Sequence, residues 1–499
     1  MPKVTIDGIE LDVAPGTNLV DAAAQADIEI PHYCYHPGLS VAGNCRMCLV
    51  DIRALSEKQN NPLPKLQIGC NTVVQEGMVV ETKNEKVEAA RASVLEFLLI
   101  NHPIDCPICD QAGECKLQEY YMDYGGYRSR FELEEKVHKE KATAIGENVM
   151  LDQERCILCT RCVRFLDEVT DTHELTITER GDHSELTLAA GKTVDNAYAT
   201  NIVDICPVGA LTSRRFRFQA RVWYLDTTDS VCTGCATGCN IEVHSRRGVI
   251  YRLKPRYNAD VNGYWMCDHG RTTFEQNVAP DRLRASLTRE SESFLELEAP
   301  AVARRAAIAL ENSGRVGVVV SAGVTVEEGE LLGRILDRLG GGARILVSPE
   351  TSEIADDGKL ISTDRFPNRR GLESLGFEKL DGDTPPADLD ALIIARADVA
   401  ALGDGWKALL EGLTTTVVLD ERVTDTLGYA DHVLAVASHF ESDGTFVNRD
   451  GRTQRFEKAV EPPGTAVAGQ SALRDLLVAL GGAELESEGE SLAAGNAPA

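Results

Sequence analysis

Residues 156–162 read CILCTRC, and Cys206-Pro207 lies further along the chain. Three cysteines with two residues between neighbours, followed by a remote cysteine before a proline, match a known ligand spacing for a 4Fe-4S cluster. The remote cysteine is displaced by an insertion that includes residues 182–195, and no second triplet of the same form follows. The stretch therefore predicts a domain over residues 140–220 that holds one cluster. Its expected ligands are Cys156, Cys159, Cys162 and Cys206.

A second set of cysteines lies upstream and has the form Cys34-x10-Cys45-x2-Cys48, with Cys70 further on. A loop cysteine, a C-x2-C pair and one distant cysteine is the plan of 2Fe-2S ferredoxins, although their first spacer is shorter. These four residues are therefore the expected ligands of a 2Fe-2S cluster.

The set His102-x3-Cys106-x2-Cys109-x5-Cys115 follows an amphipathic stretch, residues 84–100, which predicts a helix that stops before a proline. Three cysteines are one ligand short of an all-thiolate site. The histidine at the helix exit can supply the missing ligand, which predicts a second 4Fe-4S site. The alternative is that His102 only caps the end of the helix.

The last set is Cys232-x2-Cys235-x3-Cys239 followed by Cys267. With it, all fifteen cysteines of the chain are assigned, together with one histidine. No cysteine remains to serve as a nucleophile. An odd number of cysteines in a reducing compartment also argues against a disulfide framework.

Zinc is the alternative metal for each set, because C-x2-C pairs often bind it structurally. Zinc sites usually pair two short knuckles, whereas two of these sets are triplets with a remote fourth ligand. Four adjacent sets of this kind favour iron-sulfur clusters over zinc.

The overall composition limits the other functions open to the chain. With 78 acidic against 51 basic residues, its net charge of -27 would repel a nucleic-acid backbone. We find no G-x-G-x-x-G turn for a nicotinamide and no Ser, His and Asp set for catalysis, so no independent catalytic site is expected. Residues 1–20 lack the form of a signal peptide, and no apolar run is long enough to cross a bilayer. The expected location is cytoplasmic, with any membrane link through a partner.

Sequence patterns also predict elements at both ends of the chain. An alternating stretch around an Asp-Gly turn predicts a β-hairpin, and an Ala-rich helix should follow it. From about residue 284, strand-like runs alternate with amphipathic stretches, which predicts a doubly wound α/β domain with a parallel sheet. The final residues, 485–499, are predicted to be disordered. The predicted elements are the hairpin 4–13, the helix 18–26, the strands 316–321, 344–347, 391–395 and 415–419, and the helix 327–339.

The order of the cysteine sets resembles the large iron-sulfur subunit of bacterial NADH:quinone oxidoreductase, the peripheral arm of complex I. The set that begins at His102 is the most specific part of this resemblance. The resemblance implies one 2Fe-2S and three 4Fe-4S clusters on the four sets assigned above. It also implies that electrons come from a flavin-bearing NADH-oxidising subunit and leave through further clusters towards quinone. The last cluster, at Cys232 to Cys267, is expected to lie off that route. The chain would then be a peripheral subunit on the cytoplasmic side of the inner membrane.

The region from about residue 226 is similar to molybdopterin oxidoreductases, both in its Cys232 set and in residues 442–452, SDGTFVNRDGR. Those enzymes need a Cys, Ser or selenocysteine ligand to molybdenum and usually have a lysine two residues after the last cluster cysteine. Here that position is His269. We therefore expect a truncated scaffold that carries no molybdopterin. Two alternatives remain, a molybdopterin enzyme and a cluster subunit of a soluble NAD-linked hydrogenase or formate dehydrogenase complex.

The expected fold class is a multidomain α+β chain followed by α/β. A 2Fe-2S ferredoxin-like β-grasp domain is expected first, then a one-His/three-Cys 4Fe-4S domain and a 4Fe-4S ferredoxin-like domain. A molybdopterin-oxidoreductase-type cluster domain, the α/β domain and the tail complete the chain. Their expected bounds are 1–80, 81–125, 140–220, 225–282, 283–484 and 485–499.

Overall fold

The computed structural model describes residues 1–56, 58–181, 183–347, 355–380 and 384–481. The chain forms two compact units, Met1–Leu225 and Asp226–Ala499. Among the described residues, no helix has both the length and the apolar composition needed to cross a lipid bilayer. The predicted disordered tail lies outside the described residues.

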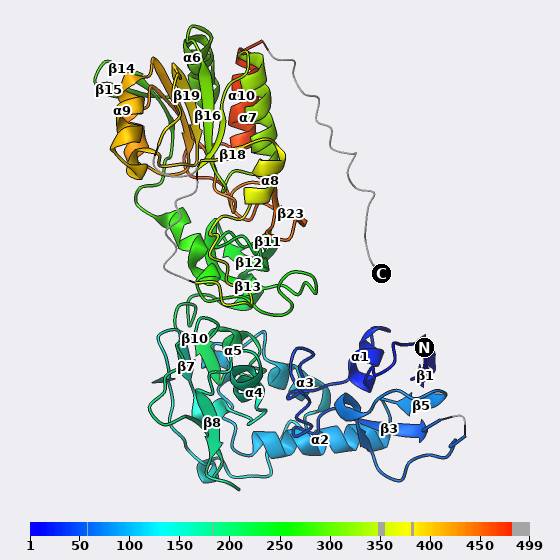
Figure 1. The fold of residues 1–499 in the computed structure, drawn as a ribbon. Coiled ribbons are helices and arrows are strands. Elements are labelled where there is room, and N and C mark those ends of the chain that lie inside the picture. The colour runs from blue at the N-terminus through cyan, green and yellow to red at the C-terminus, as the bar shows by residue number, and fades with distance from the viewer. Residues whose placement is uncertain (57, 182, 348–354, 381–383, 482–499) are drawn as a thin grey trace. The chain divides into compact units, whose positions relative to one another are not determined.

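The first unit begins with the predicted hairpin, which joins a mixed sheet in the order β2-β1-β5-β3-β4 (Figure 1). Asp7 and Gly8 both have positive φ, 49° and 87°, as a tight two-residue hairpin turn requires. Asn18 caps the predicted short helix by accepting from the amides of Val20 and Asp21. The remaining elements of the unit carry the loops that hold the cysteines. The elements of this unit are β1 (Lys3–Ile6), β2 (Ile9–Asp12), α1 (Leu19–Ala24), β3 (Leu49–Ala54), β4 (Gln67–Ile68), β5 (Met78–Glu81), α2 (Glu85–Leu99), α3 (Lys116–Tyr124), β6 (Thr143–Ala144), β7 (Val149–Leu151), α4 (Arg161–Glu168), β8 (Leu175–Thr178), β9 (Glu185–Leu188), α5 (Asn201–Asp204) and β10 (Leu211–Ser213).

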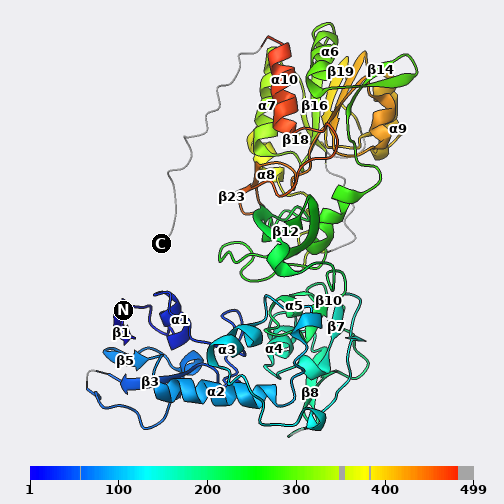
Figure 2. The same ribbon diagram turned by 180° about the vertical axis from the view of Figure 1, so that it is seen from behind.

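The second unit contains a three-layer α/β domain, as predicted. Its strands follow the order β15-β14-β21-β20-β19-β16-β17-β18, and the six from β21 to β18 are parallel. Figures 1 and 2 show α9 on one side of this sheet and α6, α7 and α10 on the other. The elements of this unit are β11 (Asp226–Val231), β12 (Asn240–Arg246), β13 (Val249–Pro255), β14 (Ser286–Glu290), β15 (Ser293–Leu297), α6 (Ala299–Glu311), β16 (Val316–Ser321), α7 (Val326–Arg338), β17 (Arg344–Val347), α8 (Arg369–Ser374), β18 (Glu378–Lys379), β19 (Ala391–Ala395), α9 (Asp404–Gly412), β20 (Thr415–Asp420), β21 (His432–Ala435), β22 (Gly444–Val447), β23 (Thr453–Phe456) and α10 (Gly469–Ala479).

The sheet differs from the prediction at one edge, because β14 pairs with β21 in the antiparallel sense and with β15 as a hairpin. The central strands were predictable because both of their faces are buried. Ile393 faces one apolar cluster and its neighbours Leu392 and Ile394 face the other. The edge hairpin is partly exposed and has no such continuous apolar run.

A largely buried charge network lies just beyond the carboxyl ends of β19 and β20, the edge where doubly wound sheets usually bind ligands. Arg396 forms ion pairs with Glu328 at 2.9 Å and with Glu421 at 3.3 Å. Its guanidinium also donates to the carbonyl of Ala437. At this point of the sheet edge, the charged side chains are therefore paired with one another.

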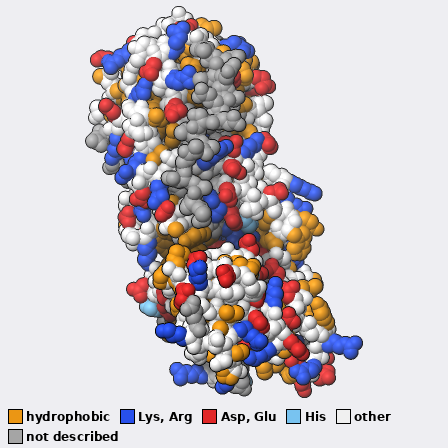
Figure 3. Space-filling view, turned by 90° about the vertical axis from the view of Figure 1, so that its right-hand side faces the viewer, with side chains coloured by type: hydrophobic (Ala, Val, Ile, Leu, Met, Phe, Trp, Pro, Cys, Tyr) orange, Lys and Arg blue, Asp and Glu red, His pale blue; other side chains and the backbone are white. Residues whose placement is uncertain are grey.

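Acidic and basic side chains are interspersed over the face shown in Figure 3. Acidic residues also occur in nearly every segment of the sequence.

Arg396→Met should destabilise the second unit by about 3 kcal/mol, because it leaves the buried Glu328 without its cation, whereas Glu421 keeps an ion pair with Arg282. Arg422→Met is the control. It breaks an ion pair with Asp281 in which both side chains are about a third exposed, so it should cost about 1 kcal/mol at most. Hydrogen exchange of the β19 and β20 amides measures both effects. Equal losses of protection in the two variants would contradict the assignment of a stabilising role to the Arg396 network.

Candidate iron-sulfur sites

All fifteen cysteines carry free thiols, so the chain forms no disulfide. Within the described ranges, no compact group of three His, Cys, Asp or Glu side chains could hold a single metal ion. A cluster is larger than a single ion and needs only that its ligand loops converge.

The first set converges in a loop of the N-terminal domain. Cys34 lies beside Cys45 and Cys70, whose thiols lower its pKa. The sulfurs of Cys48 and Cys70 are 3.4 Å apart. Gly69 makes this approach possible, because its amide donates to the carbonyl of Cys48 at 2.8 Å and an added Cβ would lie only 3.0 Å from that oxygen. The structure therefore brings together all four residues that the sequence proposed.

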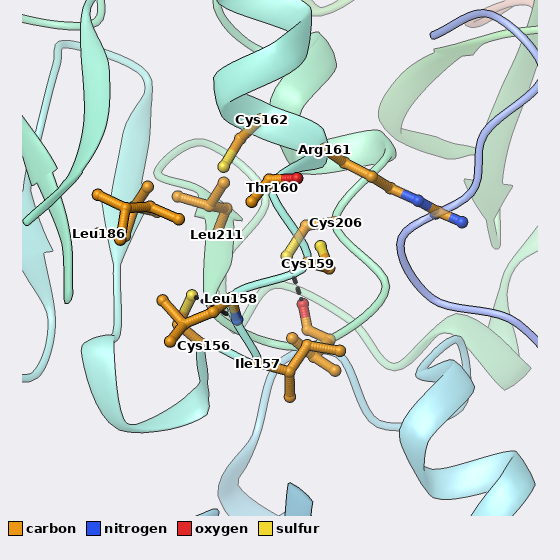
Figure 4. Close-up of a pocket in the computed structure, with 13 residues that line it drawn as sticks. Cys156, Ile157, Leu158, Cys159, Thr160, Arg161, Cys162, Leu186, Cys206 and Leu211 are labelled. Carbon is orange, nitrogen blue, oxygen red and sulfur yellow. Dashed lines mark hydrogen bonds between the residues drawn. The ribbon is translucent and has the colours of Figure 1, made fainter. Parts of the chain in front are cut away.

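The third set lines one small cavity (Figure 4). Leu158 and Thr160 have positive φ, 54° and 63°, which turns the chain sharply between the cysteines. Such backbone costs of order 1 kcal/mol or more per residue, and it is typical of functional loops. The rest of the lining is largely apolar, as a buried cluster requires. The lining residues are Cys156, Cys159, Cys162 and Cys206 with Ile157, Leu158, Thr160, Arg161, Ile177, Leu186, Val208, Ala210 and Leu211.

Thiols in this cavity are held in their protonated form while no metal is bound. Burial raises the pKa of Cys156 to about 12 and that of Cys159 to about 11. The amide of Leu158 already points at the sulfur of Cys156, at 3.4 Å. The donor set fits a cluster, which would displace the protons and use the amide as a donor to its sulfur ligand.

The second set lies between α2 and α3. Burial raises the pKa of Cys115 to about 11, and the nearby Cys109 and Cys106 add to this shift. His102 and Cys109 have two charged neighbours in common, Asp105 and Arg155. The three cysteines therefore lie together, and the histidine lies in the same charged surroundings as one of them.

His102 is free to act as a ligand because another residue caps α2. The ammonium of Lys136 donates to the carbonyls of Leu99, Ile100 and His102 at 2.8, 3.0 and 2.8 Å. Burial lowers the pKa of His102 to about 4, so the imidazole is neutral at pH 7, as ligation requires. Its Nδ1 is buried without a hydrogen-bond partner in the described part of the chain. These observations fit ligation better than helix capping.

The fourth set lies in the second unit, in the loops that follow β11 and β13. The pKa of Cys239 is raised chiefly by burial, and also by Cys232, Cys235 and Cys267 around it. Amides of two glycines donate to sulfurs: Gly234 to Cys232 and Gly270 to Cys267, each at 3.4 Å. This set therefore also converges. Residue His269, at the position of the usual lysine, lies beside the same loop, since an added Cβ at Gly234 would be 3.2 Å from its ring.

The SDGTFVNRDGR stretch, residues 442–452, covers the fourth set. It forms β22 and the turn to β23, and the amide of Arg449 donates to the carbonyl of Ala236 at 2.7 Å. Asn448 donates to the carbonyl of Thr237 at 3.2 Å. The similarity noted in the sequence therefore corresponds to direct contact with the loop that carries the cysteines.

The third set contacts the first through the side chains of α4. Arg164 donates to the carbonyl of Cys34 at 2.5 Å and to that of Cys159 at 3.4 Å. Arg161 donates to the carbonyl of Tyr35. In the opposite direction, Asn44 donates to the carbonyl of Leu158 at 3.2 Å. The two ligand loops are therefore directly hydrogen-bonded.

The third set also contacts the second. The amide of Lys116 donates to the carbonyl of Pro207 at 3.1 Å, and an added Cβ at Gly209 would lie 2.4 Å from the sulfur of Cys109. Arg155 forms an ion pair with Asp105 at 2.6 Å. Each of these contacts links a residue at or near a ligand of the second set to a residue near a ligand of the third set.

The first and second sets are separated by an aromatic pair. The rings of Tyr33 and Tyr120 are 5.4 Å apart, and Tyr33 lies near both Cys45 and Cys115, whose charges add to the effect of burial in raising its pKa. The third set is therefore hydrogen-bonded to both other sets, whereas those two meet across side chains.

Cysteine spacing did not predict the charged residues around the sets. Arg155, Arg161 and Arg164 join neighbouring sets, and Lys136 caps α2. The only local signal is the arginine inside CILCTRC, because a charge among buried ligands is unusual. The partners that link these residues to another set or to the end of α2 are far away in sequence, so no local pattern identifies them.

Sequence models of five protein families match successive segments of the chain. They are a 2Fe-2S iron-sulfur cluster binding domain at 2–85, the NADH-ubiquinone oxidoreductase-G iron-sulfur binding region at 91–130, the ferredoxin-like domain of NADH-quinone oxidoreductase subunit 3 at 146–212, the molybdopterin oxidoreductase Fe4S4 domain at 225–277 and molybdopterin oxidoreductase at 385–477. The expected order of fold types is thereby confirmed.

Curated relatives include a subunit of the NADH-quinone oxidoreductase of Rickettsia felis, which is 37% identical over 68% of this chain and 49% of its own length. The NADH-ubiquinone oxidoreductase 75 kDa subunit of Reclinomonas americana is 38% identical over 72% of this chain and 51% of its own length. The chain thus spans about half the length of these two relatives. A chain in the crystal structure of a NAD+-reducing [NiFe]-hydrogenase is 30% identical, with 44% of this chain and 91% of that chain covered and a TM-score of 0.39.

Proposed function

We propose that this chain is an electron-transfer subunit of the peripheral arm of an NADH-quinone oxidoreductase. The proposal follows from its family, because the chain belongs to the family of the 75 kDa subunit of that complex. Its relatives are subunits of oxidoreductases, and its domains are of the iron-sulfur type. In this proposal, electrons come from a flavin-bearing NADH-oxidising subunit and pass through the clusters of this chain towards quinone. The chain would lie on the cytoplasmic side of the inner membrane and would reach the membrane only through its partners.

The proposed cofactors are one 2Fe-2S and three 4Fe-4S clusters. The first set would hold the 2Fe-2S cluster and the other three sets the 4Fe-4S clusters. Each cluster would supply one-electron redox chemistry, while the chain places the ligands and excludes water. The proposed ligands are Cys34, Cys45, Cys48 and Cys70; His102, Cys106, Cys109 and Cys115; Cys156, Cys159, Cys162 and Cys206; and Cys232, Cys235, Cys239 and Cys267.

One observation carries the proposal most directly: the ligand loops of three sets are joined inside one compact unit. Electron tunnelling falls steeply with distance, so adjoining ligand loops are what a conducting chain needs. The hydrogen bonds support the order first set, third set, second set, which differs from the order in the sequence.

The second set is the best candidate for the exit of electrons within this unit. Ile104 and Ile108, next to its ligands, are 63% and 66% exposed, and Phe218 is 63% exposed. Arg217 and Arg221 line a cavity of about 470 Å³ together with Ile108 and Phe218. We infer that an acceptor partner covers this face. The fourth set belongs to the other unit and would lie off the route.

The main alternative is a cluster subunit of a soluble NAD-linked hydrogenase or formate dehydrogenase complex, or a molybdopterin enzyme. The latter would carry molybdenum, which the proposed function does not require. Metal content separates the proposed function from the molybdopterin alternative.

Anaerobically purified chain should contain about 14 iron atoms, with zinc and molybdenum well below one atom each, because one 2Fe-2S and three 4Fe-4S clusters need that much iron. Elemental analysis together with acid-labile sulfide measures this content. Several zinc atoms and little iron would exclude the cluster assignment, and stoichiometric molybdenum would favour the enzyme alternative.

His102→Ala should disturb the second cluster alone, since it removes a ligand and leaves the three other sets intact. His102→Cys should restore that cluster at a lower reduction potential, because a thiolate adds negative charge where a neutral imidazole stood. Redox titrations followed by electron paramagnetic resonance (EPR) report each cluster separately.

The control for this experiment is Lys136→Met, which removes the cap of α2 and keeps the histidine. The clusters should remain in this variant. If Lys136→Met and His102→Ala gave the same spectra, or if His102→Ala changed none of them, His102 would have only a structural role.

Cys235→Ala should remove one 4Fe-4S signal and weaken the local fold, because binding energy of the metal is also folding energy. NADH:quinone activity per assembled complex should largely survive. The matched change Cys159→Ala should abolish that activity, since it breaks the route at its middle. An intact Cys235→Ala complex that is as inactive as Cys159→Ala would place the fourth cluster on the route.

A further inference from the structure

Arg161 is a largely buried arginine at the junction of the first and third ligand sets. It is the first residue of α4 and lies inside the CILCTRC loop. Its guanidinium donates to the carbonyl of Ile205, next to Cys206, at 3.0 Å, and to the carbonyl of Tyr35, next to Cys34. Figure 4 shows its side chain directed away from the cavity of the third set, towards a neighbouring segment.

The charge of Arg161 has no carboxylate partner in the described part of the chain, and its buried Nε–H has no hydrogen-bond partner there. A cation that is withdrawn from water without a counter-charge is destabilising. Its place at the start of a helix adds to the cost, because the helix dipole disfavours a positive charge there. Neither helix stability nor an ion pair with a carboxylate therefore explains its position.

Arg155 provides a useful contrast within the same unit. It is buried and lies at the junction of the second and third sets, but its charge is balanced by Asp105 at 2.6 Å and Asp152 at 3.3 Å. Arg155 therefore has carboxylate partners of its own, whereas no carboxylate among the described residues pairs with Arg161.

The groups that can balance Arg161 are the cysteines on either side. Burial lowers the pKa of the Arg161 guanidinium, and Cys159 and Cys206 of the third set and Cys34 of the first counteract this shift. An arginine stays charged even so. Cysteines that bind iron do so as thiolates, so a cluster held by four of them carries net negative charge.

We propose that Arg161 is the shared counter-ion of the first and third clusters and raises the reduction potential of both. This inference rests on the assignment of these two sets as cluster sites, but on no particular donor or acceptor. Each reduction adds one negative charge to a cluster, and a nearby cation shielded from water stabilises that charge. Arg161 is therefore a positioning residue, which acts on the potentials and joins the two ligand loops.

The test compares Arg161→Gln, which removes the charge, with Arg161→Lys, which keeps the charge and loses the planar fork of donors. Both are made in the full chain, reduced chemically and titrated by EPR. Arg161→Gln should lower the reduction potential of the first and of the third cluster by at least about 59 mV. For a one-electron couple this shift is a tenfold change in the ratio of oxidised to reduced cluster. Arg161→Lys should stay close to the wild-type values. The second cluster, beside the balanced Arg155, should shift less than either.

Iron analysis of the same samples separates this inference from the proposed function. Wild-type chain without iron would contradict the cluster assignment itself. Loss of the first and third clusters in Arg161→Gln, with both retained in Arg161→Lys, would also support a requirement for charge. Two variants that behave alike, whether both keep wild-type potentials or both lose the clusters, would overturn the inference.

Discussion

The close approach of the third ligand loop to the other two is the constraint on which the first unit depends. The loop itself is sharply turned at Leu158 and Thr160, and this conformation must be stabilised from outside. Arginine side chains of α4 supply part of that support by donating to carbonyls of the first loop. Glycine at 209 supplies another part, since any side chain there would meet the sulfur of Cys109. The same contacts that hold the loop also bring the three sets of cysteines next to one another.

The second unit holds its cysteines differently. Its set is closed by β22 and the following turn, which bring Asn448 and Arg449 onto the loop. The neighbouring α/β domain is stabilised by two apolar layers and by the network around Arg396. In this unit the turn between β22 and β23, which lies far along the chain, contacts the loop that carries the cysteines. In the first unit the ligand loops contact one another.

Much of the fold and the site could be predicted from the sequence, for identifiable reasons. The hairpin at Asp7-Gly8 and the buried central strands follow from local pattern, and the cysteine sets follow from spacing. The antiparallel edge of the large sheet was missed because its strands are partly exposed. Arg161 and Lys136 could not be assigned roles either, since their partners are backbone carbonyls far away in the chain. Residue type and spacing predict which cysteines belong to one set, but they do not show how the loops of different sets meet.

The measurement that tests the account most directly is the spin relaxation of the reduced 2Fe-2S cluster in the isolated chain, followed by pulsed EPR. If the first and third clusters adjoin, reduction of the third should speed the relaxation of the first. Cys159→Ala should abolish this effect, and His102→Ala should leave it in place. Identical relaxation in the wild type and in Cys159→Ala, with the first cluster intact in both, would contradict the proposed arrangement.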